Sequence, residues 1–333
     1  MERLTPERAG WILDGVRGVR VLVVGDLMLD RYIVGAVDRI SPEAPVPVVR
    51  VEEESATVGG AGNVAANVTA LGASARVVGC VGRDAAGELL RTELAALGIA
   101  TDGLVPTDER PTTVKTRILA RRQQVVRVDR ETDDDASPAL ADALARVAGA
   151  FVAESDVLVA EDYNKGVLVP GVIRAALAAA AARAIPVVVD PKRRNFFAYP
   201  GATVFKPNAK ELADAMGDRL HPDDPRWMEA TRERLACRNL LLTLGDRGMA
   251  LQCADGGHVR IPTVARSVYD VSGAGDIVTA VMALGIAGGA SVVEAALLAG
   301  HAAAVGVGKA GVAAVTPGEI LEHVRTHQEL RAM

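Results

Sequence analysis

Short runs of β-branched and aliphatic residues alternate with longer alanine- and leucine-rich segments along most of this 333-residue chain. Such uninterrupted apolar runs are typical of parallel strands that are buried on both faces. We expect strands at residues 19–24, 76–81, 157–159, 186–189, 203–205 and 240–243, and helices at residues 87–97, 138–152 and 169–183. This order predicts an α/β fold with a doubly wound, mostly parallel sheet flanked by helices, which binds ligands beyond the carboxyl ends of its strands.

Two segments, residues 31–54 and 112–129, break the alternation because both have strand-like patterns without helices between the strands. Pro42, Pro45 and Pro47 lie in the first segment, and the alternating pattern of the second predicts a hairpin. We interpret the two segments as one small β-sheet lid. A second copy could cover its exposed edges and apolar face, so we expect a homodimer through the lid. The charge run at residues 130–135 predicts a solvated turn between lid and core.

Composition excludes several classes of protein. The formal charge of −5 and the aromatic content of 3% argue against a nucleic-acid partner, which needs basic surfaces and stacking platforms. No stretch approaches the roughly 20 apolar residues of a membrane span, and the N-terminus lacks a signal-peptide core. Cys80, Cys237 and Cys253 are scattered without close pairs, as in reduced thiols. We therefore expect a cytoplasmic protein that does not contact membranes.

The strongest indication of chemistry is the stretch Asp270-Val-Ser-Gly-Ala-Gly-Asp276, which leads directly into the apolar run 277–284. A glycine turn at a helix N-terminus directs backbone N–H groups at one point and favours a phosphate there. Asp276 could take a proton from a hydroxyl that attacks this phosphate, which is the chemistry of a kinase of small alcohols. The plain structural alternative is a loop with an aspartate that caps the helix.

A second glycine cluster, Gly59-Gly60-Ala61-Gly62-Asn63, opens a helix-like segment at residues 64–71. Its glycines allow close approach of the backbone to a ligand, and Asn63 can both donate and accept hydrogen bonds. A sugar fits these properties. The alternative is a glycine-rich helix cap without a ligand.

Together, in this order and about 210 residues apart, the two clusters resemble the two signatures of the ribokinase-like (PfkB) carbohydrate kinase family. The resemblance extends from Val21 to Pro317 and includes the segment Asn208-Ala-Lys-Glu211. It implies ATP and Mg²⁺ as cofactors, with Asp276 as the catalytic base. By the same resemblance, the anion hole is formed by Gly273, Ala274 and Gly275.

Four further strings resemble the kinases that phosphorylate O1 of D-glycero-β-D-manno-heptose 7-phosphate: Gly25-Asp-Leu-Met-Leu-Asp-Arg-Tyr32, Arg39-Ile-Ser-Pro-Glu-Ala-Pro-Val-Pro47, Glu161-Asp-Tyr-Asn-Lys-Gly166 and Asp190-Pro-Lys192. This resemblance implies formation of the 1,7-bisphosphate on the route to ADP-heptose for lipopolysaccharide core. Many members carry a fused nucleotidyltransferase domain with a His-x-Gly-His loop, which this sequence lacks. We therefore expect residues 1–333 to be a single kinase domain that catalyses the kinase step alone.

On the sugar side, Asp30 follows the first predicted strand and, as the resemblance also implies, would accept hydrogen bonds from sugar hydroxyls, where the alternative is a turn cap. Asp162, Tyr163 and Lys165 follow a strand and should face the ligand edge of the sheet. A phosphorylated sugar needs fixed cations, and the lid and sheet edge offer Arg39, Arg117, Arg127 and Lys165, for which surface solvation is the alternative.

On the nucleotide side, the resemblance implies that Asn208 and Glu211 position Mg²⁺ and phosphate, with Glu211 reaching the metal through water. Lys192 would bind the ATP phosphates. The cleft would be lined by Thr243, Gly245 and Gly248, with residues 305–312 beside the adenine. In many family members the first aspartate of the glycine turn helps to bind potassium, which suggests K⁺ ligands at Asp270, Ser272 and Gly311.

Three other functions stay open from the sequence alone. Another kinase of this family could act on fructose, a phosphohexose or a 2-keto-3-deoxy acid, because the glycine signatures do not encode the sugar. A nicotinamide-dependent oxidoreductase is disfavoured, because Gly25 is followed by Asp26 and Leu27 instead of a Gly-x-Gly-x-x-Gly fingerprint. A non-catalytic sugar sensor is disfavoured by the retention of Asp276 with its full glycine turn.

Overall fold

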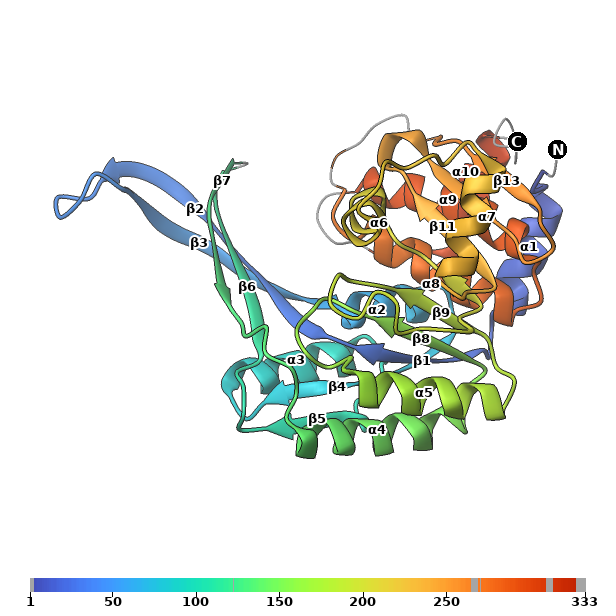
Figure 1. Cartoon of the computed structure of the whole chain (residues 1–333). Coiled ribbons are helices and arrows are strands. Elements are labelled where there is room, and N and C mark those ends of the chain that lie inside the picture. Colours follow the sequence, from blue (N-terminus) through green and yellow to red (C-terminus); the bar gives the residue numbers. More distant parts are fainter. Residues whose placement is uncertain (1–2, 122, 265–268, 270, 310–313, 328–333) are drawn as a thin grey trace.

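The computed structural model describes residues 3–121, 123–264, 269, 271–309 and 314–327. These residues form a layered α/β body, from which a second sheet projects as a long arm (Figure 1). The body contains a nine-stranded sheet in the order β13-β12-β11-β10-β9-β8-β1-β4-β5. Its strands are β1 (Arg20–Gly25), β4 (Ser74–Gly82), β5 (Leu104–Thr107), β8 (Val157–Glu161), β9 (Val187–Asp190), β10 (Val204–Phe205), β11 (Asn239–Thr243), β12 (Met249–Gln252) and β13 (His258–Ile261).

Neighbouring strands of this sheet are parallel, except that β12 pairs antiparallel with both β11 and β13. The predicted fold class, a doubly wound and mostly parallel sheet, is confirmed. The sequence did not predict β5, β12 or β13. All three are only four residues long, and β12 and β13 contain polar residues such as Gln252, His258 and Arg260, so none forms the continuous apolar run of a central strand.

Helices cover both faces of the sheet and create two separate cores. One core is built from α1 (Pro6–Gly15), α2 (Ala61–Ala70), α3 (Ala85–Ala96), α8 (Ala274–Ala287), α9 (Val292–Val307) and α10 (Pro317–Thr326). The other is built from α4 (Pro138–Val152), α5 (Pro170–Ala182), α6 (Ala209–Met216) and α7 (Pro225–Arg234). Strand β1 explains why both faces must be covered, because Val21 and Val23 enter the first core whereas Leu22 and Val24 enter the second.

The arm is a four-stranded sheet in the order β3-β2-β6-β7, formed by β2 (Leu27–Ile40), β3 (Pro47–Gly60), β6 (Thr113–Ala120) and β7 (Gln123–Arg130). Its two hairpins are antiparallel, and they join through the parallel pair β2–β6. The segments 31–54 and 112–129 therefore form one lid sheet, as predicted. The first hairpin is longer than predicted, since its register runs from Leu27 opposite Gly60 to Ile40 opposite Pro47.

The lid is attached closely to the body. Only Asp26 separates the end of β1 from the start of β2, and α2 follows β3 without an intervening residue. None of the helices in the described part of the chain combines the length and the apolar character that crossing a bilayer requires.

Candidate active site

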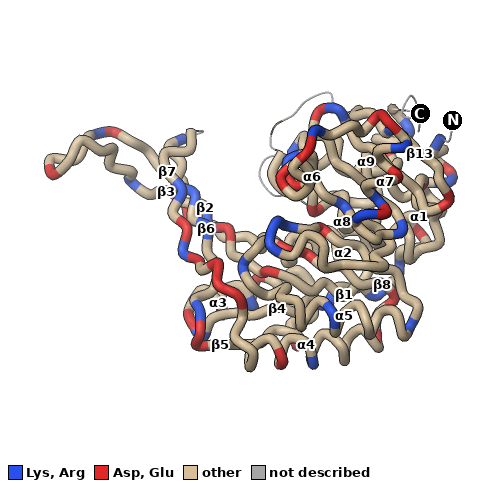
Figure 2. Tube along the Cα trace, in the orientation of Figure 1, with Lys and Arg blue, Asp and Glu red and all other residues tan. Residues whose placement is uncertain are grey.

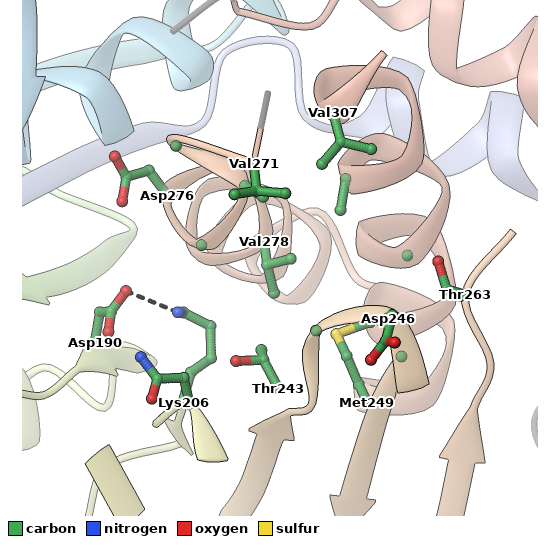
Figure 3. A pocket seen from close by; sticks show the side chains of 18 of the residues that line it. Asp190, Lys206, Thr243, Asp246, Met249, Thr263, Val271, Asp276, Val278 and Val307 are labelled. Carbon is green, nitrogen blue, oxygen red and sulfur yellow. Dashed lines mark ion pairs between the residues drawn. The ribbon is translucent and has the colours of Figure 1, made fainter. Parts of the chain in front are cut away.

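The glycine turn lies at the N-terminus of α8, where it borders a cavity of about 520 Å³ (Figure 3). Gly273 caps the helix in the left-handed conformation, with φ +78°, and among the described residues no side chain caps this end. Asp276 is therefore not the helix cap, which removes the plain structural alternative. The predicted anion-hole residues Gly273, Ala274 and Gly275 all line the cavity beside Asp276, at the end of the helix where N–H groups and the dipole favour an anion.

The Asp276 carboxylate is held from two sides. The Asn63 amide donates to Oδ2 at 2.5 Å, and the Tyr163 hydroxyl donates to Oδ1 at 2.9 Å. The fold thus brings both glycine clusters and the loop after β8 to one carboxylate. Burial raises the pKa of Asp276 to about 6, against the opposing effect of the Asn63 hydrogen bond. Such a carboxyl group is a suitable proton acceptor near neutral pH.

Glycines of the second cluster are required for packing inside the protein. A Cβ on Gly59 would lie 2.4 Å from the Asp30 carboxylate, and a Cβ on Gly60 would lie 2.4 Å from the Asp26 carbonyl oxygen. Gly60 also has φ +59°. The close approach that the sequence predicted is therefore made to Asp30 and Asp26 in this structure, and it allows the lid base to lie against the start of α2.

Asp26, which the sequence analysis did not assign to the site, organises the loop that carries Tyr163. Its buried carboxylate accepts the backbone N–H groups of Tyr163 at 2.8 Å, Lys165 at 3.0 Å and Val167 at 3.0 Å. These bonds fix the loop after β8 so that Tyr163 reaches Asp276. The only signal in the sequence was a polar residue at the carboxyl end of a buried strand.

At the lid base, Asp30 is buried and forms an ion pair with Arg117 of the neighbouring strand β6. The two predicted sugar-side residues are thus brought together. Arg39 lies nine residues beyond Asp30 on β2, or about 30 Å along an extended strand. The structure does not bring Arg39 to this chain's own Asp276. Arg127 lies on β7, where it pairs with Asp129 at 2.9 Å.

The acidic stretch that joins β7 to α4, red in Figure 2, does more than form a solvated turn. Glu131 accepts from the ammonium groups of both Lys115 and Lys165 at 2.8 Å, and Asp133 lies 2.5 Å from Lys165. Residues 133–135 are exposed, as predicted for a solvated turn between lid and core, and Glu131 and Asp133 in addition bind lysines of the lid and of the loop after β8. The charge of the Lys165 ammonium is therefore balanced by carboxylates in this structure.

Asp162 is turned into the protein interior. Its carboxylate accepts from the Tyr199 hydroxyl at 3.2 Å and from the Asn164 backbone N–H at 2.7 Å. Burial raises its pKa to about 6. Asp162 therefore has a clear packing role in the loop after β8, whereas its neighbour Tyr163 lines the cavity.

The predicted nucleotide-side residues lie around the same cavity. Six of them line it: Lys192, Asn208, Glu211, Thr243, Gly245 and Gly248. Asn208 and Glu211 form a capping box at the start of α6, each accepting the other's backbone N–H at 2.8 Å. Glu211 also pairs with Lys192 at 2.6 Å. A lysine and a carboxylate side by side fit a phosphate chain with its Mg²⁺.

Helix α9 closes the far end of the cavity with small and apolar side chains. Val307 lines it as expected from the predicted adenine segment, together with Gly300, Ala303 and Ala304, which the sequence did not indicate. Among the predicted potassium ligands, Ser272 lies exposed in the turn before α8, while Asp270 and Gly311 lie outside the described residues.

A group of charged residues beneath the glycine turn was not predicted as part of the site. Carboxylate oxygens of Glu161, Asp190 and Asp276 lie within 4.8 Å of one another. The Lys206 ammonium lies 2.7 Å from Asp190 (Figure 3). Both strand ends, β8 and β9, deliver a carboxylate here because parallel strands present their carboxyl ends at one edge.

The sequence of this chain is similar to those of known proteins. Two curated relatives, each named "Bifunctional protein HldE", are 48% identical over 307 residues (Caulobacter vibrioides) and 47% identical over 303 residues (Azorhizobium caulinodans). These alignments cover 91% and 90% of this chain and 63% of each relative, so the chain spans less than two thirds of their length.

Solved structures show the same fold at low sequence identity. A putative ribokinase from Agrobacterium tumefaciens superposes with a TM-score of 0.75 at 22% identity, covering 94% of this chain and 100% of that one. Phosphofructokinase-2 from Escherichia coli, solved in complex with potassium, gives 0.74 at 20% identity, covering 93% and 99%. The model of the pfkB family of carbohydrate kinases matches residues 19–318. This chain therefore belongs to the pfkB family of carbohydrate kinases.

Proposed function

We propose that this chain transfers the γ-phosphoryl group of ATP to O1 of D-glycero-β-D-manno-heptose 7-phosphate and forms the 1,7-bisphosphate for ADP-heptose and lipopolysaccharide core. The observation that carries the kinase chemistry is the buried Asp276 beside the glycine turn of α8, at the wall of the cavity. The heptose assignment is supported by the four sequence strings and by the similarity to proteins named HldE. The chain would supply the kinase activity of such a bifunctional protein.

In this mechanism ATP lies in the cavity with its phosphates between Lys192 and the glycine turn. Asp276 accepts the proton of the anomeric hydroxyl, whose oxygen attacks the γ-phosphorus in line with the departing ADP oxygen. N–H groups of Gly273, Ala274 and Gly275 stabilise the transferred group. Mg²⁺, held through water by Glu211, would offset the phosphate charge, and K⁺ near Asp270, Ser272 and Gly311 would organise the turn.

The sugar lies at the lid base in this proposal, where Arg117 pairs with Asp30 and the Asn63 amide donates to Asp276. Its 7-phosphate is bound by cations that now pair with carboxylates, above all Lys165, which exchanges Glu131 and Asp133 for the phosphate. A dianionic phosphate competes well with a carboxylate because it carries more charge. The lid then excludes water from the transfer.

A homodimer through the lid is part of the proposal. Exposed apolar side chains gather on the lid strands and their connecting turn: Ile40, Val46, Val51, Val125, Val126 and Val128. They would be covered by the lid of a second copy. The outer part of β2, which carries Arg39, lies far from this chain's own base and is available to such a partner. We place the homodimer in the cytoplasm, without nucleic-acid or membrane partners.

The test is ATP-dependent ADP release with the heptose 7-phosphate, run beside fructose, fructose 6-phosphate, ribose and a 2-keto-3-deoxy acid. Asp276→Asn is the control for catalysis by this site. Turnover of the heptose phosphate, with the new phosphate at C1 by NMR and no turnover by the variant, supports the proposal. Turnover of another sugar keeps the kinase chemistry and rejects the heptose. Binding of sugar without any turnover favours the sensor.

A further inference from the structure

Lys206 is an ammonium group buried beneath the active-site turn. It follows directly after β10, and its side chain is 3% exposed. Figure 3 shows it reaching toward Asp190 beside the first turn of α8, and the two groups are 2.7 Å apart. Lys206 also lines the cavity, together with Gly275 and Asp276. A buried lysine in contact with a nucleotide-sized cavity needs an explanation, because burying a charge is costly.

The surrounding carboxyl groups keep this lysine charged. Burial lowers the pKa of Lys206, but the charges of Asp190 and then Glu161 outweigh it and hold the pKa above the usual value. Glu161 is itself fully buried, and this burial raises the pKa of its carboxyl group well above the ordinary range. The ion pair with Asp190 therefore holds the Lys206 ammonium in one place beside the turn.

The Lys206 ammonium lies close to the backbone of the turn at Gly275. A Cβ placed on Gly275 would lie 3.6 Å from the Lys206 nitrogen and 3.8 Å from the Asp190 carboxylate. Because Lys206 and Gly275 line the same cavity at this short separation, a phosphoryl oxygen bound by the N–H groups of the turn comes within reach of the ammonium. Fixed cations in a site with little water stabilise developing phosphoryl charge strongly.

We propose that Lys206 is a further catalytic residue, whose ammonium contacts the phosphoryl group while it passes from ATP to the sugar hydroxyl. This rests on the proposed kinase function but does not depend on which sugar is used. The bond between the γ-phosphorus and the bridging oxygen of ADP breaks as the new bond to the sugar oxygen forms. Asp276 takes the hydroxyl proton, and Lys206 keeps its own proton throughout.

The test compares Lys206→Met and Lys206→Arg with a matched control, Lys210→Met. Lys210 is 82% exposed, pairs with Asp214 in its own helix, and does not line the cavity. Removal of a fixed donor at a developing oxyanion costs about 10²–10³-fold in kcat. We expect Lys206→Met to lose that much in kcat with less than a tenfold change in KM for ATP. Lys206→Arg should recover part of kcat, and Lys210→Met should match the wild type.

A second readout separates catalysis from packing. Calorimetry with MgADP alone and with MgADP plus aluminium fluoride, a mimic of the transferred phosphoryl group, needs no sugar. We expect Lys206→Met to keep affinity for ADP within about threefold and to lose at least tenfold for the fluoride complex. If the variant fails to fold, Asp190→Asn with Lys206→Met removes both charges of the pair and serves for the same binding measurement.

The inference is overturned if Lys206→Met retains kcat within threefold of the wild type. It is also overturned if affinities for ADP and for the fluoride complex fall equally, because that result describes a structural ion pair. A wild-type protein that turns over none of the sugars would defeat the proposed function, whereas the fluoride measurement would still judge Lys206.

Discussion

The hydrogen bond from Tyr163 to Asp276 makes the pH dependence of catalysis a direct test of the base. Burial raises the pKa of Asp276 to about 6, while the donors Asn63 and Tyr163 lower it by stabilising the charged form. A base acts in its deprotonated form, so wild-type kcat/KM should fall as the pH drops through about 6. Tyr163→Phe removes one donor and should raise the pKa further.

The size of the shift follows from the strength of such a bond. A hydrogen bond to a charged group contributes about 1.5–3 kcal/mol, and one pKa unit corresponds to about 1.4 kcal/mol. The acid limb should therefore move up by about 1–2 units in Tyr163→Phe. The deprotonated fraction at pH 7 then falls roughly two- to tenfold, while the rates of the two proteins converge above about pH 9.

The assay is kcat/KM from pH 5 to pH 9.5 by coupled ADP release, with Tyr199→Phe as a matched control. Tyr199 is also buried and also donates its hydroxyl to a carboxylate, but this carboxylate belongs to Asp162, at 3.2 Å. The control should leave the acid limb in place. An unmoved limb in Tyr163→Phe, or an equal shift in both variants, would refute the assignment of Asp276 as the base positioned by Tyr163.

Three further predictions follow from the site and the lid. Asp276→Asn should lose at least about 10²-fold in kcat. It should also raise the melting temperature at pH 8 but not at pH 4. The pKa of Asp276 is about 6 in the folded protein and 3.8 ordinarily, so ionisation of this carboxyl destabilises the folded protein by up to about 3 kcal/mol above pH 6. Equal melting temperatures of the variant and the wild type at pH 8 would contradict this. Asp26→Asn should lower both melting temperature and kcat, since three backbone N–H groups lose a carboxylate acceptor, and an unchanged kcat would remove Asp26 from the positioning of the loop. Light scattering should give a dimer for the wild type and for Val128→Thr but a monomer for Val128→Lys, and a wild-type monomer at micromolar concentration would reject the lid interface.

The sequence predicted those features that depend on local patterns. The buried strand β1 is a continuous apolar run, and the turn before α8 contains the glycines that its left-handed residue Gly273 requires. Asp276 could be identified as a candidate base because the glycine turn before it and the apolar run after it predict a helix N-terminus. Thr243, Gly245 and Gly248 could be placed at the cavity because they follow a strand at the ligand edge.

The sequence did not predict contacts that join distant segments. Lys165 was expected to contact the sugar or its phosphate, but in this structure Glu131 and Asp133 approach it from a stretch about 30 residues earlier in the chain. Lys206 showed no pattern of its own, since it is paired with Asp190 at the end of another strand. Pairing of charges is decided by the tertiary structure, so the residue types alone do not reveal which cation stays available to a substrate.

Asp26 joins the base of the lid to the loop that carries Tyr163. Its N–H group donates to the Glu161 carbonyl, its carbonyl oxygen accepts from Ala61 at the start of α2, and its carboxylate holds the loop with Tyr163. Both strands of the long lid hairpin meet the body at this point. The attachment of the lid and the position of Tyr163 therefore depend on the same residue, Asp26. A substitution of Asp26 should therefore disturb the attachment of the lid and the position of Tyr163 together.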